Sequence, residues 1–302
     1  MNAPKLVTDT TTQRWSRRRF MGGAVSVAAL GSFATACSGA AHPASAPASR
    51  ASASPGNVTS TAPVSTPATS GVDAELISRR YEGLKPFATA PSPPAVKPIT
   101  LSASDPTVFS HVPLTDKVVF ITIDDGLDKD PGFIQMVKDF QVPITIDLAN
   151  LFISDDYAYF GKLYETGYIS IQNHTVSHPL DMPGLSPARQ LDEISGQQEI
   201  LHREYGVTPY IFRSPGGNYD ETTIASAGEA GLKGVMMWKE AMEISDMAYQ
   251  TSVHRLHPGD IILAHFRGPA QLDGETMVRM MIRLFKHIQA QGFTIADITK
   301  YV

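Results

Sequence analysis

The sequence has a single cysteine, Cys37, among its 302 residues. One thiol cannot form an intramolecular disulfide, and it excludes the paired-cysteine sites that hold zinc or carry out redox chemistry. The chain also lacks an excess of basic residues, since 25 Lys and Arg stand against 30 Asp and Glu and give a formal net charge of −5. Nucleic-acid binding needs a basic surface, so we expect no nucleic-acid partner.

The motifs of several common enzyme classes are missing as well. The chain contains no GxSxG nucleophile elbow, no GxxxxGK[ST] phosphate loop, no GxGxxG dinucleotide fingerprint and no HExxH zinc motif. Each of these motifs brings a specific reactive group or phosphate cradle to one place in a fold. The chemistry of this chain must therefore come from another set of residues.

Residues 1–37 are typical of an export signal. The segment SRRRFM at 16–21 precedes a short apolar run over 22–34, and paired arginines in this position resemble a twin-arginine signal. The run is shorter than the roughly 20 residues that a membrane span needs, which disfavours the alternative of an uncleaved anchor. Small residues directly before Cys37 resemble a lipobox, although cleavage without lipidation is a second interpretation of the same residues.

A lone exposed thiol in an exported protein needs an explanation, so we expect Cys37 to be lipidated. The protein would then lie on the extracellular face of the membrane and touch it only through its N-terminal lipid or anchor. Residues 38–71 are nearly all Ser, Ala, Pro and Thr, a composition that predicts a disordered tether, with a glycosylated stalk as the alternative.

Two further regions follow the tether. Residues 72–116 are rich in proline and predict an extended N-terminal arm with one short helix at 74–81. From residue 117 to 302 strands and helices alternate, which predicts one α/β domain with a parallel sheet, either open or closed into a short barrel. The predicted strands are 118–123, 144–148, 168–172, 210–212, 234–238, 260–264 and 293–295, and the main helices 131–140, 157–166, 186–205, 221–230 and 274–290.

Polar residues gather where these strands end. Asp124 and Asp125 follow the first strand, His174 and His178 follow the third, and Arg213 follows the fourth. Trp238 ends the fifth strand and His265 follows the sixth. The carboxyl ends of parallel strands are where α/β active sites assemble, so we expect these residues to form one site.

Two histidines four residues apart and a carboxylate can hold one metal ion and leave positions open for water and substrate. Taken alone, each part has a simpler interpretation. Asp-Asp-Gly is a common turn sequence, and histidines at this spacing are often solvated or packed in a core. The placement of all of them at one edge favours the site.

Four segments in order resemble the motifs of the polysaccharide deacetylase family, carbohydrate esterase family 4. TIDDG at 122–126 is similar to TFDDG, HTVSH at 174–178 to H[ST]xxH, RSPGG at 213–217 to RPPYG, and LAH at 263–265 to LxH. The resemblance covers 117–302. It implies a distorted (β/α) barrel of about seven parallel strands and a metal-dependent hydrolase that removes N-acetyl or O-acetyl groups from a glycan.

The resemblance also implies a role for each residue. Asp125, His174 and His178 would bind a divalent metal cation, with zinc as the expected ion. Asp124 would be the general base and His265 the general acid that protonates the leaving group. Further roles concern the surroundings of these groups: Arg213 would hold Asp124 in place, the backbone N–H of Gly216 would bind the developing oxyanion, and Leu263 would line the acetyl pocket.

The chain departs from the family pattern at two motifs. Gly216 stands where the third motif has an aromatic residue, so one wall of the substrate groove is missing. The Asp-Trp motif that supports the catalytic histidine is not clear; Glu243 and Asp246 are the candidates, of which we prefer Asp246. Trp238 is either a glycan platform or a core residue.

The expected substrate is an acetylated polysaccharide, with peptidoglycan, chitin-like oligomers and xylan all open, and we expect a monomer. Two alternatives follow from the departures. The altered third and fourth motifs favour a glycan-binding module that has lost turnover, and the missing wall at Gly216 favours a hydrolase of small amides.

Overall fold

The computed structural model describes residues 72–302. The expected signal segment 1–37 with Cys37, and the expected tether 38–71, lie outside the described residues. Within 72–302, no helix combines the length and the apolar character that crossing a membrane would take.

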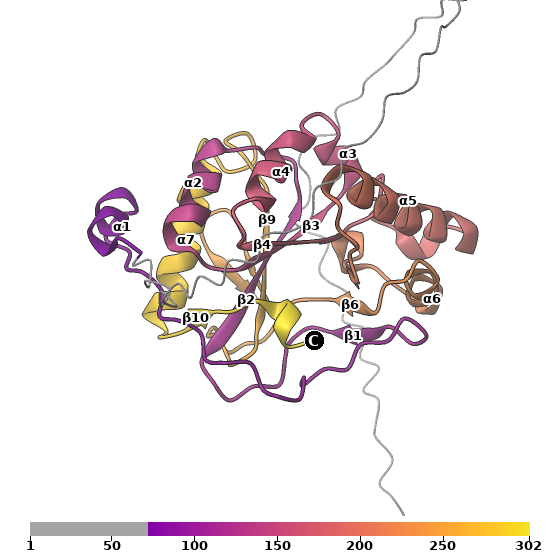
Figure 1. The fold of residues 1–302 in the computed structure, drawn as a ribbon, viewed down its shortest axis with the longest axis horizontal. Coiled ribbons are helices and arrows are strands. Elements are labelled where there is room, and N and C mark those ends of the chain that lie inside the picture. The colour runs from indigo at the N-terminus through magenta and orange to yellow at the C-terminus, as the bar shows by residue number, and fades with distance from the viewer. Residues whose placement is uncertain (1–71) are drawn as a thin grey trace, which may run out of the picture. The chain divides into compact units, whose positions relative to one another are not determined.

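A curled, mostly parallel sheet forms the centre of the domain, and the main helices lie around its outside (Figure 1). Within residues 117–302 seven adjacent strands run parallel, which confirms the expected barrel-type fold of about seven parallel strands; the curled sheet forms a half-barrel. In spatial order they are β6 (Gly234–Met236), β5 (Ile211–Phe212), β4 (Ile169–Asn173), β3 (Ile144–Leu148), β2 (Val118–Asp125), β9 (Ile261–His265) and β7 (Glu240–Met242).

The helices begin and end where the sequence provides the signals for it. Ser186 caps α5 (Pro187–Tyr205) by accepting a hydrogen bond from the N–H of Arg189, and Gly206 ends this helix in the left-handed conformation. Asp220 forms a capping box at the start of α6 (Glu221–Glu229). The other helices are α1 (Ala74–Arg80), α2 (Pro131–Phe140), α3 (Asn150–Ile153), α4 (Tyr157–Tyr164) and α7 (Met277–Ala290).

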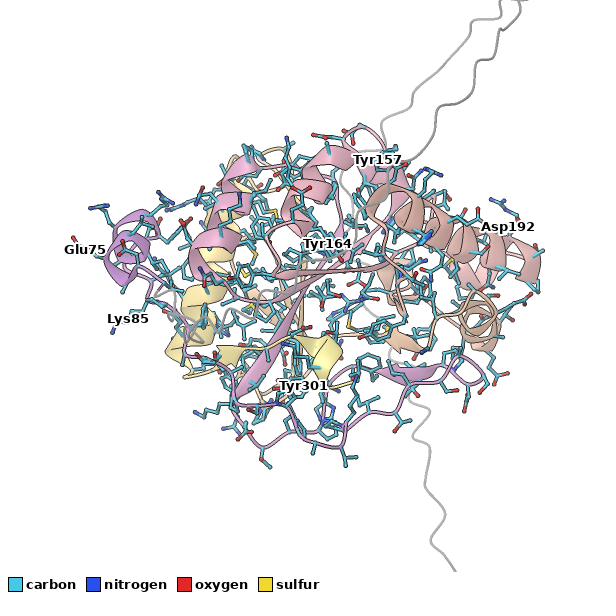
Figure 2. The ribbon with its side chains drawn as sticks, in the orientation of Figure 1. Glu75, Lys85, Tyr157, Tyr164, Asp192 and Tyr301 are labelled. Carbon is cyan, nitrogen blue, oxygen red and sulfur yellow. The ribbon has the colours of Figure 1, made fainter. Side chains whose placement is uncertain are left out.

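Side chains divide between the core and the outer faces of the helices. The first seven residues of β2 are buried, as are the apolar residues on one side of α7. Charged side chains such as Asp192 of α5 and Glu75 of α1 point outward (Figure 2). In the sheet β2 lies between β3 and β9, so its carboxyl end lies in the middle of the sheet.

Three short strands were not predicted. β1 (Thr107–Phe109) lies in the proline-rich arm and pairs with β6, so this part of the arm extends the sheet. β8 (Met247–Tyr249) is antiparallel to β7, and both strands have only three residues, too few to show a period of alternation. The strand expected at 293–295 is β10 (Thr294–Ile295); it pairs with the start of β2 and is not one of the seven adjacent parallel strands.

Candidate metal centre and active site

Five polar residues that were expected to form one site lie at the carboxyl ends of neighbouring strands. Asp124 and Asp125 are the last residues of β2, and His265 is the last residue of β9, directly opposite Asp124 in the pairing of the two strands. His174 follows β4 and Arg213 follows β5. The order of the strands therefore brings together residues up to 141 positions apart in the chain.

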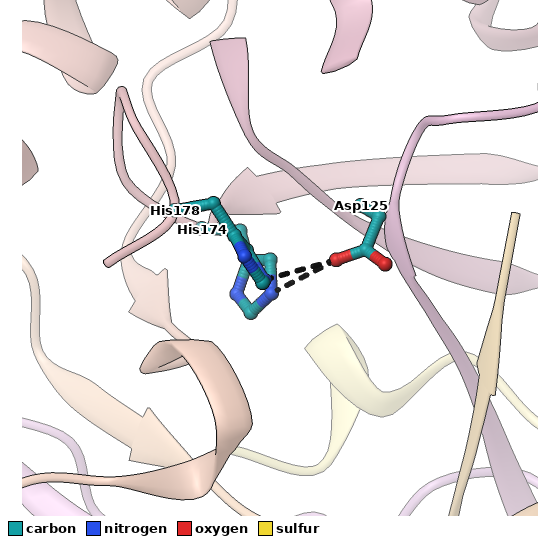
Figure 3. A group of neighbouring side chains, drawn as sticks. All are labelled: Asp125, His174 and His178. Carbon is teal, nitrogen blue, oxygen red and sulfur yellow. Dashed lines mark ion pairs between the residues drawn. The ribbon is translucent and has the colours of Figure 1, made fainter. Parts of the chain in front are cut away.

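Asp125, His174 and His178 form a compact group in which one ligand atom from each residue lies within 4.8 Å of the others (Figure 3). Asp125 Oδ1 is 3.1 Å from Nε2 of His178 and 3.5 Å from Nε2 of His174. This oxygen is buried and has no hydrogen-bond partner within the described part of the chain. A buried carboxylate oxygen facing two imidazole nitrogens fits a cation between the three side chains.

The ring of His174 is oriented by a backbone carbonyl. Its Nδ1 lies 2.7 Å from the carbonyl oxygen of Arg213, and a carbonyl can only accept. Nδ1 therefore carries the hydrogen and Nε2 presents its lone pair toward Asp125. Metal-binding histidines are commonly held in this way.

The loop that carries His178 is fixed by the long helix α5. Buried Glu193 of α5 accepts hydrogen bonds from the backbone N–H of Ser177 (2.8 Å) and from its hydroxyl (2.6 Å). The N–H of His178 donates to Oγ1 of Thr175, and both Thr175 and His178 have positive φ. Glu193 was not predicted, because nothing in the sequence pairs a helix residue with a loop 16 positions before it.

Arg213 holds Asp124 inside the protein. The guanidinium is fully buried, and its Nη1 donates to Oδ1 of Asp124 (2.9 Å) and to the hydroxyl of Thr122 (2.7 Å). Its Nε donates to the carbonyl of Met236. Oδ1 of Asp124 is thereby occupied, while Oδ2 lies 3.7 Å from Nε2 of His174 on the side of the metal group.

A second buried carboxylate, Asp147, shares the same arginine. It lies on β3 directly opposite Asp124 in the strand pairing, 3.8 Å from Nη1 of Arg213. Neither of its side-chain oxygens has a hydrogen-bond partner among residues 72–302. Asp147 was not predicted as a site residue, because it is embedded in an apolar strand sequence and belongs to no motif.

Burial governs the protonation of both carboxylates. It raises the pKa of Asp124 to about 7 and that of Asp147 to about 7, although the positive charge of Arg213 acts in the opposite direction on each. Burial also acts on Asp125, but the close imidazoles of His174 and His178 outweigh it and hold the pKa of Asp125 well below its usual value. Asp125 is therefore ionised, as a metal ligand must be.

Among residues 72–302, neither Glu243 nor Asp246 gives His265 the expected carboxylate support. Asp246 is exposed, and it lies in the turn between β7 and β8, where its carbonyl accepts from the N–H of Glu243. Neither of these two carboxylates hydrogen-bonds to His265 in the described part of the chain. Desolvation lowers the pKa of His265 to about 3, although the charge of Asp125 opposes it, so the ring is neutral at pH 7.

The remaining expected residues surround this centre. Gly216 is exposed and has a φ of 62°, in the short turn that follows Arg213. Leu263 is buried in β9. Trp238 is half-buried, packs against Gly217 and lies with its ring 5.6 Å from the guanidinium carbon of Arg213, so it lies next to the site and also packs against the core.

Comparison with known proteins gives a consistent result. A family model described as polysaccharide deacetylase matches residues 111–235. An uncharacterised protein of Streptomyces coelicolor is 33% identical over 198 residues, which cover 65% of this chain and 78% of that protein. The peptidoglycan-N-acetylglucosamine deacetylase of Bacillus cereus is 23% identical over 63% of this chain and 92% of its own length. The crystal structure of the Bc1960 peptidoglycan N-acetylglucosamine deacetylase superimposes with a TM-score of 0.55 at 22% identity, over 65% of this chain and 92% of that one.

Proposed function

The chain belongs to the polysaccharide deacetylase family, and we propose that it hydrolyses acetyl groups, N-acetyl and also O-acetyl, on an acetylated polysaccharide. The observation that carries this proposal is the group Asp125, His174 and His178 next to the carboxylate of Asp124, which Arg213 holds. A metal-dependent hydrolase needs residues that bind the metal and a separate base that takes a proton from the attacking water. Both are present at the same edge of the sheet.

The residues fit a divalent cation. Oδ1 of Asp125 is buried without a hydrogen-bond partner in the described region, and the Nδ1 hydrogen bond of His174 leaves its Nε2 lone pair facing that oxygen. Two imidazoles and one carboxylate suit zinc, our proposed ion, as well as other first-row metals. When bound, such a metal supplies Lewis-acid chemistry, because it lowers the pKa of water and polarises a carbonyl.

Asp124 is the proposed general base. Arg213 fixes its Oδ1, so Oδ2 is the atom that would take the proton of the attacking water. Burial brings the pKa of this carboxyl to about 7, which suits a group that must accept a proton and release it again near neutral pH.

His265 is the proposed proton donor to the leaving nitrogen. Its ring is neutral at pH 7, so it must gain a proton before it can donate one. Asp124 gains a proton from water and lies opposite His265 in the pairing of β2 and β9. We therefore propose that the proton reaches the leaving amine through this pair, while the N–H of Gly216 helps to bind the developing oxyanion.

The proposed substrate is a glycan of the cell wall. The Bacillus cereus relative is named for peptidoglycan, which makes peptidoglycan our first candidate, ahead of chitin-like oligomers and xylan. Gly216 leaves the groove without an aromatic wall, and this absence favours a substrate bound by its acetyl group and its flanking sugars over one held by stacking.

We also propose that the protein is exported and anchored through Cys37. The sequence of residues 16–37 supports this proposal, as does the long Ser/Ala/Pro/Thr segment that follows. Metabolic labelling with a fatty acid tests it: label should enter the wild-type protein and be absent from Cys37→Ser. Equal labelling of the two proteins would contradict it.

Release of acetate tests the enzymatic proposal. The protein, stripped of metal with a chelator, should release no acetate from acetylated glycans and should recover activity when zinc or another divalent cation is returned. Asp124→Asn and His174→Ala should abolish the release, whereas the surface substitutions Asp192→Asn and His202→Ala should retain it. Acetate release that is unaffected by Asp124→Asn would contradict the mechanism.

A second function rests on the missing support for His265. Asp246 lies in an exposed turn, so no hydrogen bond from it helps His265 to hold a proton. A protein with such a weak proton donor would bind glycan without hydrolysing its acetyl groups. Retention of the protein on acetylated glycan, without acetate release under any metal condition, would favour this alternative.

A further inference from the structure

A second group of potential metal ligands lies at the opposite end of β9 from His265. It consists of Glu240, the first residue of β7, Asp260, which directly precedes β9, and His257 in the preceding turn. One ligand atom from each residue lies within 4.8 Å of the others. Glu240 and Asp260 are 4% and 3% exposed, whereas His257 is exposed.

The two buried carboxylates of this group have few hydrogen-bond partners among the described residues. Oε2 of Glu240 is buried and has no hydrogen-bond partner within 72–302. Oδ2 of Asp260 accepts the backbone N–H of His257 (2.6 Å), and Nδ1 of the same histidine lies 3.5 Å from that oxygen. An oxygen that is withdrawn from water and unbonded costs free energy unless a proton or a cation joins it.

Electrostatics at this point favour an added positive charge. Glu240 and Asp260 place two negatively charged groups, both nearly fully buried, within 4.8 Å of each other. Two carboxylates so close together can share one proton or bind one cation. Two carboxylates alone can share a proton without a third group. The imidazole of His257 adds the third ligand that a metal ion would use.

We propose that Glu240, Asp260 and His257 form a second site for a divalent cation of the zinc type. Two carboxylates and one imidazole are a donor set that such ions accept, and the exposed ring of His257 leaves a route of entry from solvent. The ion would link β7 to the turn before β9, and so fix the connection between β8 and β9. This site is independent of the proposed deacetylation, because its residues lie at the other end of β9.

The stoichiometry of bound zinc tests the proposal. The protein is equilibrated with zinc, dialysed against buffer, and its zinc content per chain is measured by mass spectrometry. We expect two ions in the wild type and one in each of His257→Ala, Glu240→Gln and His174→Ala. The control His254→Ala, a neighbouring exposed histidine outside the group, should keep two.

A thermal measurement separates loss of the site from loss of folding. In the His174→Ala background, zinc should still raise the melting temperature, and adding His257→Ala should remove that rise. His257 is on the surface, so this second substitution leaves the core intact. A wild type that binds only one ion, which His174→Ala removes completely, would overturn the proposal. Two bound ions in Glu240→Gln would also overturn it, because Glu240 would then hold no ion and a proton shared with Asp260 would explain the pair of buried acids.

Discussion

Replacing Asp147 by asparagine should stabilise the protein at neutral and alkaline pH. The pKa of Asp147 is about 7 in the folded chain against an ordinary value of 3.8, because burial outweighs the charge of Arg213. As the pH rises between these values, the unfolded chain releases a proton that the folded chain keeps, so the stability falls with rising pH. Asparagine cannot ionise, so this loss is absent in the variant.

The magnitude follows from the two pKa values. Each pH unit between them corresponds to about 1.4 kcal/mol, so the wild type loses at most about 4 kcal/mol by pH 8. Asp147→Asn should therefore exceed the wild type in free energy of unfolding by up to about 4 kcal/mol at pH 8. The difference should shrink by about 1.4 kcal/mol per pH unit below pH 7 and vanish near pH 4.

Urea unfolding followed by circular dichroism, at several pH values between 4.5 and 8, measures this difference. A chelator must be present, because a cation bound near Asp125 would add positive charge and lower the pKa of the neighbouring carboxyls. Asp192→Asn, which removes an exposed carboxylate, should change the stability by about 0.5 kcal/mol or less without a pH trend. A lower stability of Asp147→Asn at pH 8, or a difference that is independent of pH, would refute the reasoning.

Two further substitutions have defined expectations. Glu193→Ala should lower the affinity for the metal by about 10–100-fold in a calorimetric titration, because the loop before His178 loses its two hydrogen bonds to the Glu193 side chain. Exposed Glu199→Ala on the same helix should leave the affinity unchanged, and equal affinities of the two variants would show that the loop needs no such support. Gly259→Ala should cost well over the about 1–2 kcal/mol of a left-handed residue, because its φ is +84° and the added Cβ would lie 1.7 Å from the carbonyl oxygen of Val112. Gly274→Ala, with a φ of +90° and nothing within 4 Å of its Cβ, should show only the backbone cost in the same urea unfolding, and equal losses for the two glycines would contradict the steric argument.

The sequence predicted those parts of the fold that have strong local signals. The apolar run of β2, the helix α2 and the start of α5 at its cap all lie where they were expected, because hydrophobic period and capping residues act within a few positions. β1 and the β7–β8 hairpin were missed, since three-residue strands have too few residues to show a period and depend on pairing with distant segments.

The site was predictable where a motif or a strand end marks it, and elsewhere it was not. Asp124, Asp125 and the two histidines of HTVSH were found because strand ends and spacing identify them. Asp147 and Glu193 were missed because their roles arise from strand register and helix packing, which connect residues far apart in sequence. The surroundings of Asp246 could not be predicted for the same reason, since the turn that exposes it belongs to an unpredicted hairpin.

The position of β2 has a consequence for the durability of the site. This strand pairs with β9 on one side and with both β3 and β10 on the other, so neither of its sides forms a free edge of the sheet. A segment tied in this way opens only when the whole domain unfolds, and its backbone amides should be among the slowest to exchange with solvent. The positions of Asp124 and Asp125 should therefore persist through local opening of the surrounding loops. Sequence changes in those loops can then alter the surroundings of the site without moving these two carboxylates.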